Sequence, residues 1–120
     1  MKSWLLAAGA INAALAVAAG AFGAHGLRDR LEKPMLDVFE TGARYHLIHA
    51  LGMVLCAVIA ASGNSGARTA GWILLAGIVL FSGSLYLLAL TTAPVGPITP
   101  LGGLAFLVGW IWLAVSALRG

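Results

Sequence analysis

Long apolar stretches alternate with one short charged segment along this chain. Residues 4–24 contain no Asp, Glu, Lys or Arg, and as a helix they would extend about 31 Å, the thickness of a hydrocarbon core. A second such stretch, residues 45–61, ends at a cluster of turn-forming residues at 62–66. Because the bilayer core holds no water to satisfy backbone groups, both stretches predict membrane-spanning helices.

A third stretch without charge runs from Thr69 to Leu118 and is too long for one span. Pro94, Pro97 and Pro100 interrupt it, and proline removes a backbone donor that a helix interior needs. This pattern predicts two further spans, residues 69–90 and 101–118. The chain, residues 1–120, is therefore predicted to be a single transmembrane domain, an all-α integral membrane four-helix bundle.

Residues 27–44 differ from the spans because they hold eight of the charged side chains, against three in the rest of the chain. Apolar residues recur there every three or four positions, which is typical of an amphipathic helix. Pro34 is expected to break it and to lie in the first turn of a second helix that runs towards the second span. We expect an amphipathic interfacial segment between the first two spans, with Phe39 at the acyl boundary. Two ion pairs at i and i+4 are also expected, Asp29 with Lys33 and Glu40 with Arg44.

Two aspects of topology have competing interpretations. Met1 and Lys2 followed by apolar and small residues are also typical of a cleavable signal peptide, but the length of the uncharged stretch favours a retained span. Counting bases alone favours residues 27–44 on the cytoplasmic side. Net charge favours the opposite, because the side with the termini carries +3 and residues 27–44 carry zero. We expect both termini in the cytoplasm.

Composition excludes several classes of protein. Apolar residues make up 61% and charged residues 9%, whereas soluble domains are about one quarter charged, so the lipid bilayer is the expected partner. A net charge of +3 is too small to indicate nucleic-acid binding. The single cysteine, Cys56, excludes an internal disulfide and a thiolate metal site. The chain also lacks the common motifs of zinc enzymes, phosphate-binding loops and serine nucleophiles.

Candidate chemistry centres on the three histidines, His25, His46 and His49, at the ends of the first two spans. Histidine is the commonest metal ligand, and ionisable residues inside membranes are candidates for function. The alternative is that these side chains only bond to loop backbone at the interface. We predict a polar cluster under one membrane face that consists of His25, Glu40, Arg44, Tyr45 and His49.

Glycine and alanine are concentrated in the spans, where close helix approach drives association. On that basis Gly83→Leu is expected to disrupt the bundle more than Leu87→Ala. Ser82 and Ser84 are about 200° apart on a helix, so they are expected to face different neighbours.

Four segments resemble the YgdD/YwdK-type family of small membrane proteins of unknown function. They are residues 15–27 (LAVAAGAFGAHGL), 40–51 (ETGARYHLIHAL), 80–90 (LFSGSLYLLAL) and 98–110 (ITPLGGLAFLVGW). The resemblance implies four transmembrane helices and a bacterial cytoplasmic (inner) membrane location. Beyond the polar cluster, the motif positions it implies are Thr41, Gly42, Ser82, Gly83, Ser84, Tyr86, Thr99, Pro100, Gly102 and Gly103. His46 departs from the family pattern, where glutamine is expected, which disfavours one metal ion bound by all three histidines.

The leading functional expectation is a non-enzymatic integral membrane protein: a small transporter subunit, a binding module or a membrane assembly partner. Such a protein could act as a homo-oligomer or with a membrane partner protein. The alternative is a membrane-embedded metal-dependent enzyme that uses His25 and His49. The sequence identifies no catalytic residue, metal or cofactor.

Overall fold

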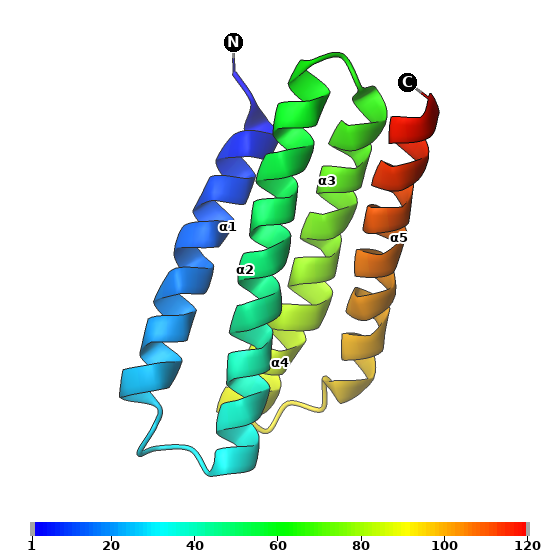
Figure 1. Cartoon of the computed structure of the whole chain (residues 1–120). Helices are drawn as coiled ribbons and strands as arrows, with labels where there is room; N and C mark the ends of the chain where they lie inside the picture. The colour runs from blue at the N-terminus through cyan, green and yellow to red at the C-terminus, as the bar shows by residue number, and fades with distance from the viewer. Residues whose placement is uncertain (1, 120) are drawn as a thin grey trace.

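A computed structural model describes residues 2–119, and in that part of the chain four long helices run antiparallel, each to the next (Figure 1). All four are long and apolar enough to cross a membrane. They comprise residues Trp4–Gly26, Lys33–Ala61, Ser65–Leu90 and Gly96–Arg119. The predicted all-α membrane bundle is confirmed.

Three of the long helices are composite. The first joins α1 (Trp4–Ala21) to a π-helical turn, η1 (Phe22–Gly26), and the second is α2 (Lys33–Ala61) alone. The third joins α3 (Ser65–Gly77) to α4 (Gly83–Leu90) through a second π-helical turn, η2 (Ile78–Ser82). The fourth begins with a 3₁₀ turn, η3 (Gly96–Ile98), and continues as α5 (Thr99–Arg119).

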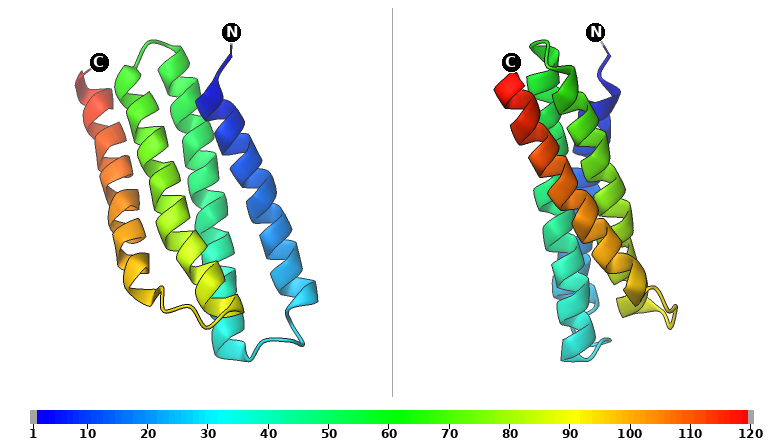
Figure 2. Two further views of the ribbon diagram at one scale, coloured as in Figure 1. Left: turned by 180° about the vertical axis from the view of Figure 1, so that it is seen from behind. Right: turned by 90° about the vertical axis from the view of Figure 1, so that its right-hand side faces the viewer.

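The bundle is flat, with extents of 49 × 28 × 17 Å. α2 packs against α1, α3 and α4, while α5 packs against α3 and η2. Two views show the helices in chain order, with α1 and α5 at opposite edges (Figure 2). The chain begins and ends at the same end of the bundle, beside the α2–α3 turn.

Local sequence explains where the helices begin. The side chain of Ser3 accepts a hydrogen bond from the Leu6 amide, and Asn64 accepts one from Ala67, both at 3.1 Å. These are N-caps, which satisfy backbone donors that a helix leaves free at its start. Pro34 lies in the first turn of α2, where its missing donor costs nothing.

The expected interfacial segment is not a separate element. Residues 33–44 form the first turns of α2, which continues without a break to Ala61. Phe39 was expected at the acyl boundary, but its side chain is only 3% exposed and its ring centroid lies 5.0 Å from that of Tyr86. The reason is that η1 and α4 cover this part of α2, so protein replaces lipid around Phe39.

Neither predicted ion pair forms within residues 2–119. The ion pair that is present joins Lys33 to Asp37 at 3.4 Å, between exposed side chains. Asp29 cannot pair with Lys33 across a helical turn, because α2 begins only at Lys33.

Close packing around glycine occurs at Gly102 and not at Gly83. A Cβ atom added at Gly102 would collide with the backbone of Leu80 and Phe81 in η2. At Gly83 the nearest atom would be the Ile78 carbonyl oxygen, 4.0 Å away. The premise that another backbone approaches Gly83 closely is therefore wrong, since α5 contacts the preceding turn instead.

Candidate functional site

The buried polar residues lie near the middle of α2. His46 is about 20 Å from either end of that helix, at about 1.5 Å per residue, and His49 is one turn further along. Their side chains are 6% and 5% exposed. The site is therefore built from groups within the helix bundle and not from a loop.

His46 forms a hydrogen-bonded network with two other helices. Its Nε2 lies 2.9 Å from Oδ1 of Asn12 on α1, and its Nδ1 lies 2.9 Å from the Tyr86 hydroxyl on α4. The Asn12 amide nitrogen donates to the Ala8 carbonyl at 2.9 Å. Since the amide oxygen can only accept, Nε2–H donates to Asn12, and Nδ1 accepts from the Tyr86 hydroxyl. A neutral His46 thus satisfies both neighbours and joins α1, α2 and α4.

The predicted cluster omitted this network, although the sequence contains signals for it. Asn12 is the only amide side chain in α1, and Tyr86 is the only phenol after residue 45. Buried polar groups need hydrogen-bond partners, so each had to find one on another helix. Which partner it finds depends on helix register, which spacing within one helix does not provide.

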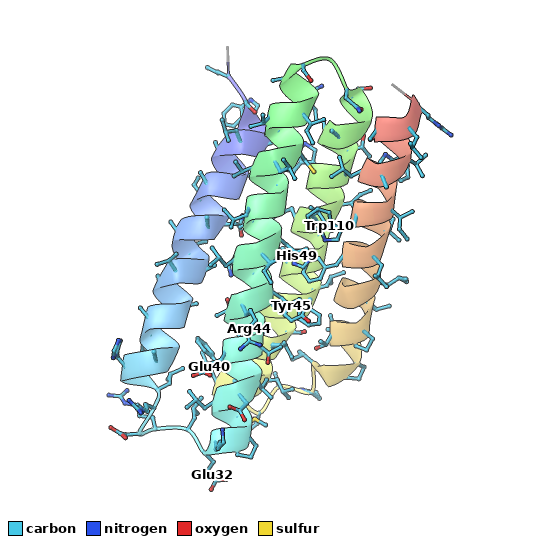
Figure 3. All side chains as sticks on the ribbon, viewed as in Figure 1. Glu32, Glu40, Arg44, Tyr45, His49 and Trp110 are labelled. Atoms are coloured by element: carbon cyan, nitrogen blue, oxygen red, sulfur yellow. The ribbon has the colours of Figure 1, made fainter. Side chains whose placement is uncertain are left out.

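His49 is held mainly by aromatic contacts. Its Nδ1–H donates to the Tyr45 carbonyl at 2.7 Å, and its ring stacks on Phe106 with centroids 3.5 Å apart. Trp110 adds a tilted contact at 5.9 Å. Figure 3 shows Tyr45, His49 and Trp110 gathered between α2 and α5. We call the group of Tyr45, His49, Phe81, Phe106 and Trp110 the aromatic cluster.

His25 does not join His49, and this part of the predicted cluster is wrong. The side chain of His25 is exposed. A Cβ at Gly23 would lie 3.0 Å from the Phe39 ring, so η1 is level with that residue. His49 is ten residues, about 15 Å, further along α2, which is too far for one metal ion to bind both histidines. The prediction fails because α2 already begins at Lys33, so the turns around Phe39 and Glu40, and not His49, lie beside η1.

The other members of the predicted cluster follow one another along α2, as Figure 3 shows for Glu40, Arg44, Tyr45 and His49. Glu40 is half-buried beside Gly23, whereas Arg44 is exposed. Of these residues, only Tyr45 contacts His49 by the bonds and ring contacts described above. Within residues 2–119, no group of three or more His, Cys, Asp and Glu side chains is placed to hold a metal ion.

Four motif positions lie at helix contacts: Ser82 on η2, Ser84 on α4, and Thr99 and Gly102 on α5. Ser82 donates to the Gly42 carbonyl of α2 at 2.7 Å, while Ser84 pairs with the Thr99 hydroxyl at the start of α5. The two serines thus face different helices, as their angular separation predicted. A Cβ at Gly42 would meet the Tyr86 ring at 3.1 Å.

Comparison with known proteins agrees with the predicted resemblance. A family model described as "Protein of unknown function (DUF423)" matches residues 19–103. The UPF0382 membrane protein YwdK of Bacillus subtilis is 53% identical over 114 residues, which cover 92% of this chain and 93% of the relative. A UPF0382 membrane protein of Staphylococcus epidermidis is 45% identical over 112 residues, covering 92% of both chains.

The protein SSP2132 of Staphylococcus saprophyticus, also a UPF0382 membrane protein, is 45% identical over 112 residues, which cover 92% of this chain and 93% of that protein. No solved structure matches the chain. The family match extends over most of the bundle, from the end of α1 to the first turns of α5. The chain therefore belongs to the DUF423 family of membrane proteins.

Proposed function

We propose that this protein is a non-enzymatic binding module of the bacterial cytoplasmic membrane. The observation that carries the proposal is a pair of surface grooves at the end of the bundle that holds the termini. One, of about 730 Å³, lies between α3 and α5, and the other, of about 430 Å³, lies between α1, α2 and α3. Both are formed where helix ends meet, at the level expected for lipid headgroups.

The interior polar groups support a structural role for the rest of the bundle. Both ring nitrogens of His46 are bonded, and Ser82 bonds to the Gly42 carbonyl across the α2–η2 contact. Within residues 2–119, no buried side-chain nitrogen or oxygen lacks a partner. Such bonds fix the helices relative to one another and so give the grooves a defined shape.

A paired measurement on His49→Gln tests whether the aromatic cluster has a functional role of its own. On the present proposal, melting temperature in detergent and complementation of a deletion phenotype change together or not at all. A variant as stable as wild type that fails to complement would overturn the proposal and assign a direct function to His49.

Metal analysis of the detergent-purified protein tests the enzyme alternative. We expect no stoichiometric zinc, iron or copper, because His25 and His49 are separated by about 15 Å along the bundle. Stoichiometric metal that disappears in a His25→Ala/His49→Ala variant would favour the metal-dependent enzyme.

The proposed orientation places both termini in the cytoplasm. Support comes from the clustering of Lys2, Arg68 and Arg119 at the end of the bundle opposite Asp29. Single cysteines at Arg68 and Arg119 should be protected from an impermeant thiol reagent in intact cells, and one at Asp29 should react, all in a Cys56→Ser background. Labelling of the first two alone would show the inverse orientation.

A further inference from the structure

The groove between α1, α2 and α3 combines cationic, aromatic and apolar walls. The start of the first helix contributes Lys2, Ser3, Trp4 and Leu5, the end of α2 contributes Ala57, Ala60 and Ala61, and α3 contributes Arg68 and Trp72. These residues come from three helices, of which α2 and α3 are joined by the short turn at residues 62–64. We call this the Lys2–Arg68 groove.

The charged side chains that line the Lys2–Arg68 groove are all positive. Both bases are exposed, and no acidic side chain lines the groove. All four acids of the chain lie between Asp29 and Glu40, at the opposite end of the bundle. Two positively charged side chains thus line one groove that has no acid in its walls, which is complementary to an anionic group such as a phosphate.

The aromatic and apolar side chains of the groove favour a ligand that has an apolar part over a free anion. Trp4 and Trp72 are 73% and 39% exposed, and indole rings favour the headgroup level of a bilayer. The groove has an apolar floor formed by Leu5, Ala57 and Ala60, which are largely covered by neighbouring side chains, so an alkyl chain would lie over this floor. A ligand that fills the groove therefore needs an anionic head and an apolar tail.

We infer that the Lys2–Arg68 groove binds an anionic phospholipid from the leaflet on the side of the termini. The phosphate lies between Lys2 and Arg68, and one acyl chain follows Leu5 and Ala57. This inference rests on the proposed binding function and names its ligand. An inorganic phosphate shares only the charge interaction and lacks the tail contacts.

The groove between α3 and α5 provides a matched control. It contains one base, Arg119, beside Trp112, and part of its polar wall is already used, because the Asn64 amide donates to the Ser116 carbonyl at 3.2 Å. Arg119→Gln removes one positive charge from the same end of the bundle without touching the Lys2–Arg68 groove.

The experiment counts lipids retained by the full chain. Protein is reconstituted in vesicles of phosphatidylglycerol and phosphatidylcholine in equal amounts, extracted in mild detergent and analysed by native mass spectrometry. A base near the bilayer surface contributes about 1 kcal/mol to anionic-lipid binding, which corresponds to roughly fivefold, so Lys2→Gln/Arg68→Gln should lower phosphatidylglycerol retention by about 25-fold. Arg119→Gln should leave retention within about twofold, because Arg119 does not line the Lys2–Arg68 groove.

Three results would overturn the inference. Equal retention of phosphatidylcholine would show apolar binding only, and equal losses in the Arg119→Gln variant would show a general effect of surface charge. Displacement of the lipid by millimolar inorganic phosphate would identify a simple anion site. All variants should keep the wild-type melting temperature because the substituted side chains are exposed. The complementation and metal measurements use no added lipid, so a failed lipid test is distinguishable from failure of the proposed function.

Discussion

The two faces of α2 hold their histidines by different means. On the face toward α1 and α4, His46 is bonded through both ring nitrogens to side chains of other helices. On the face toward α5, His49 makes one hydrogen bond, to the backbone of its own helix, and its ring stacks on Phe106. The first face is therefore joined to α1 and α4 by directional hydrogen bonds. The second is joined to α5 by ring contact, which relies on the close approach of the α5 and η2 backbones.

This difference indicates which changes each face should tolerate. A hydrogen-bonded contact needs a matching donor and acceptor, whereas a stacked contact needs shape and area. Glutamine, which the family pattern leads us to expect at position 46, has an amide NH2 that can donate and a carbonyl oxygen that can accept, and neutral histidine likewise has a donor and an acceptor. The aromatic face instead depends on how closely α5 approaches η2.

The largest effect is expected from breaking the aromatic face at its closest backbone contact. Gly102→Ala places a methyl group against the backbone of Leu80 and Phe81, so α5 must move away and the stack of His49 on Phe106 is lost. Overpacking of this kind typically costs about 1 to 3 kcal/mol.

Thermal unfolding in detergent measures the effect of Gly102→Ala, and Gly83→Ala is its control. The control methyl group meets only an atom at 4.0 Å, so we expect its stability to stay close to wild type. Equal destabilisation of the two variants would contradict the importance of the α5–η2 approach.

The hydrogen-bonded face should be broken by His46→Leu and preserved by His46→Gln. Leucine leaves the Asn12 oxygen and the Tyr86 hydroxyl without a partner, at a cost of about 1 to 2 kcal/mol. Glutamine can bond to both. Unfolding in a denaturing detergent such as SDS compares the two variants, and equal losses of stability would show that the imidazole ring acts by its shape.

A smaller effect is expected from His49→Phe, which sharpens the contrast with position 46. The phenyl ring can still stack on Phe106, and the only bond removed is the one to the Tyr45 carbonyl. Side-chain hydrogen bonds in membrane proteins average about 0.6 kcal/mol, so the same unfolding measurement should show a loss of that order. A loss as large as that of His46→Leu would mean that both faces rely on directional bonds.

The smallest effect is expected at Cys56, which lies in the apolar core of the bundle. Its side chain is 0% exposed and packs with Met53 and Leu74 in the apolar core. We expect the thiol to resist a maleimide reagent in the native protein and to react fully in SDS, as mass spectrometry would show. Rapid labelling of the native protein would indicate that the core opens locally around α2.

The elements of the fold were largely predictable from the sequence, because their causes are local. Uncharged stretches, turn clusters and prolines located the four spans, and the family match agrees with the resemblance in four ordered segments. Pro34 correctly indicated the start of a helix that leads into the second span, but the charges at residues 33–44 wrongly indicated a surface position for Phe39, which is covered by η1 and α4.

The candidate site was predicted less well than the fold. His49 and Tyr45 do contact one another, since both lie on one helix at a spacing of four. His25 was grouped with them because it was expected to be at the same depth, but η1 is level with Phe39, ten residues before His49 on α2. Asn12, His46 and Tyr86 lie on three different helices, so no spacing within one helix could have predicted that they meet.

Four membrane-spanning helices could be deduced from the amino-acid order alone, because burying a charge or an unpaired backbone group in lipid is costly at every position. The order of residues also placed all acids at one end of the bundle. Which polar groups meet could be learned only from the packed helices, since these contacts depend on the register between them. A shift of one residue along a helix turns a side chain by about 100°. After such a shift Asn12 and His46 would no longer meet, and both would be left without this hydrogen-bond partner.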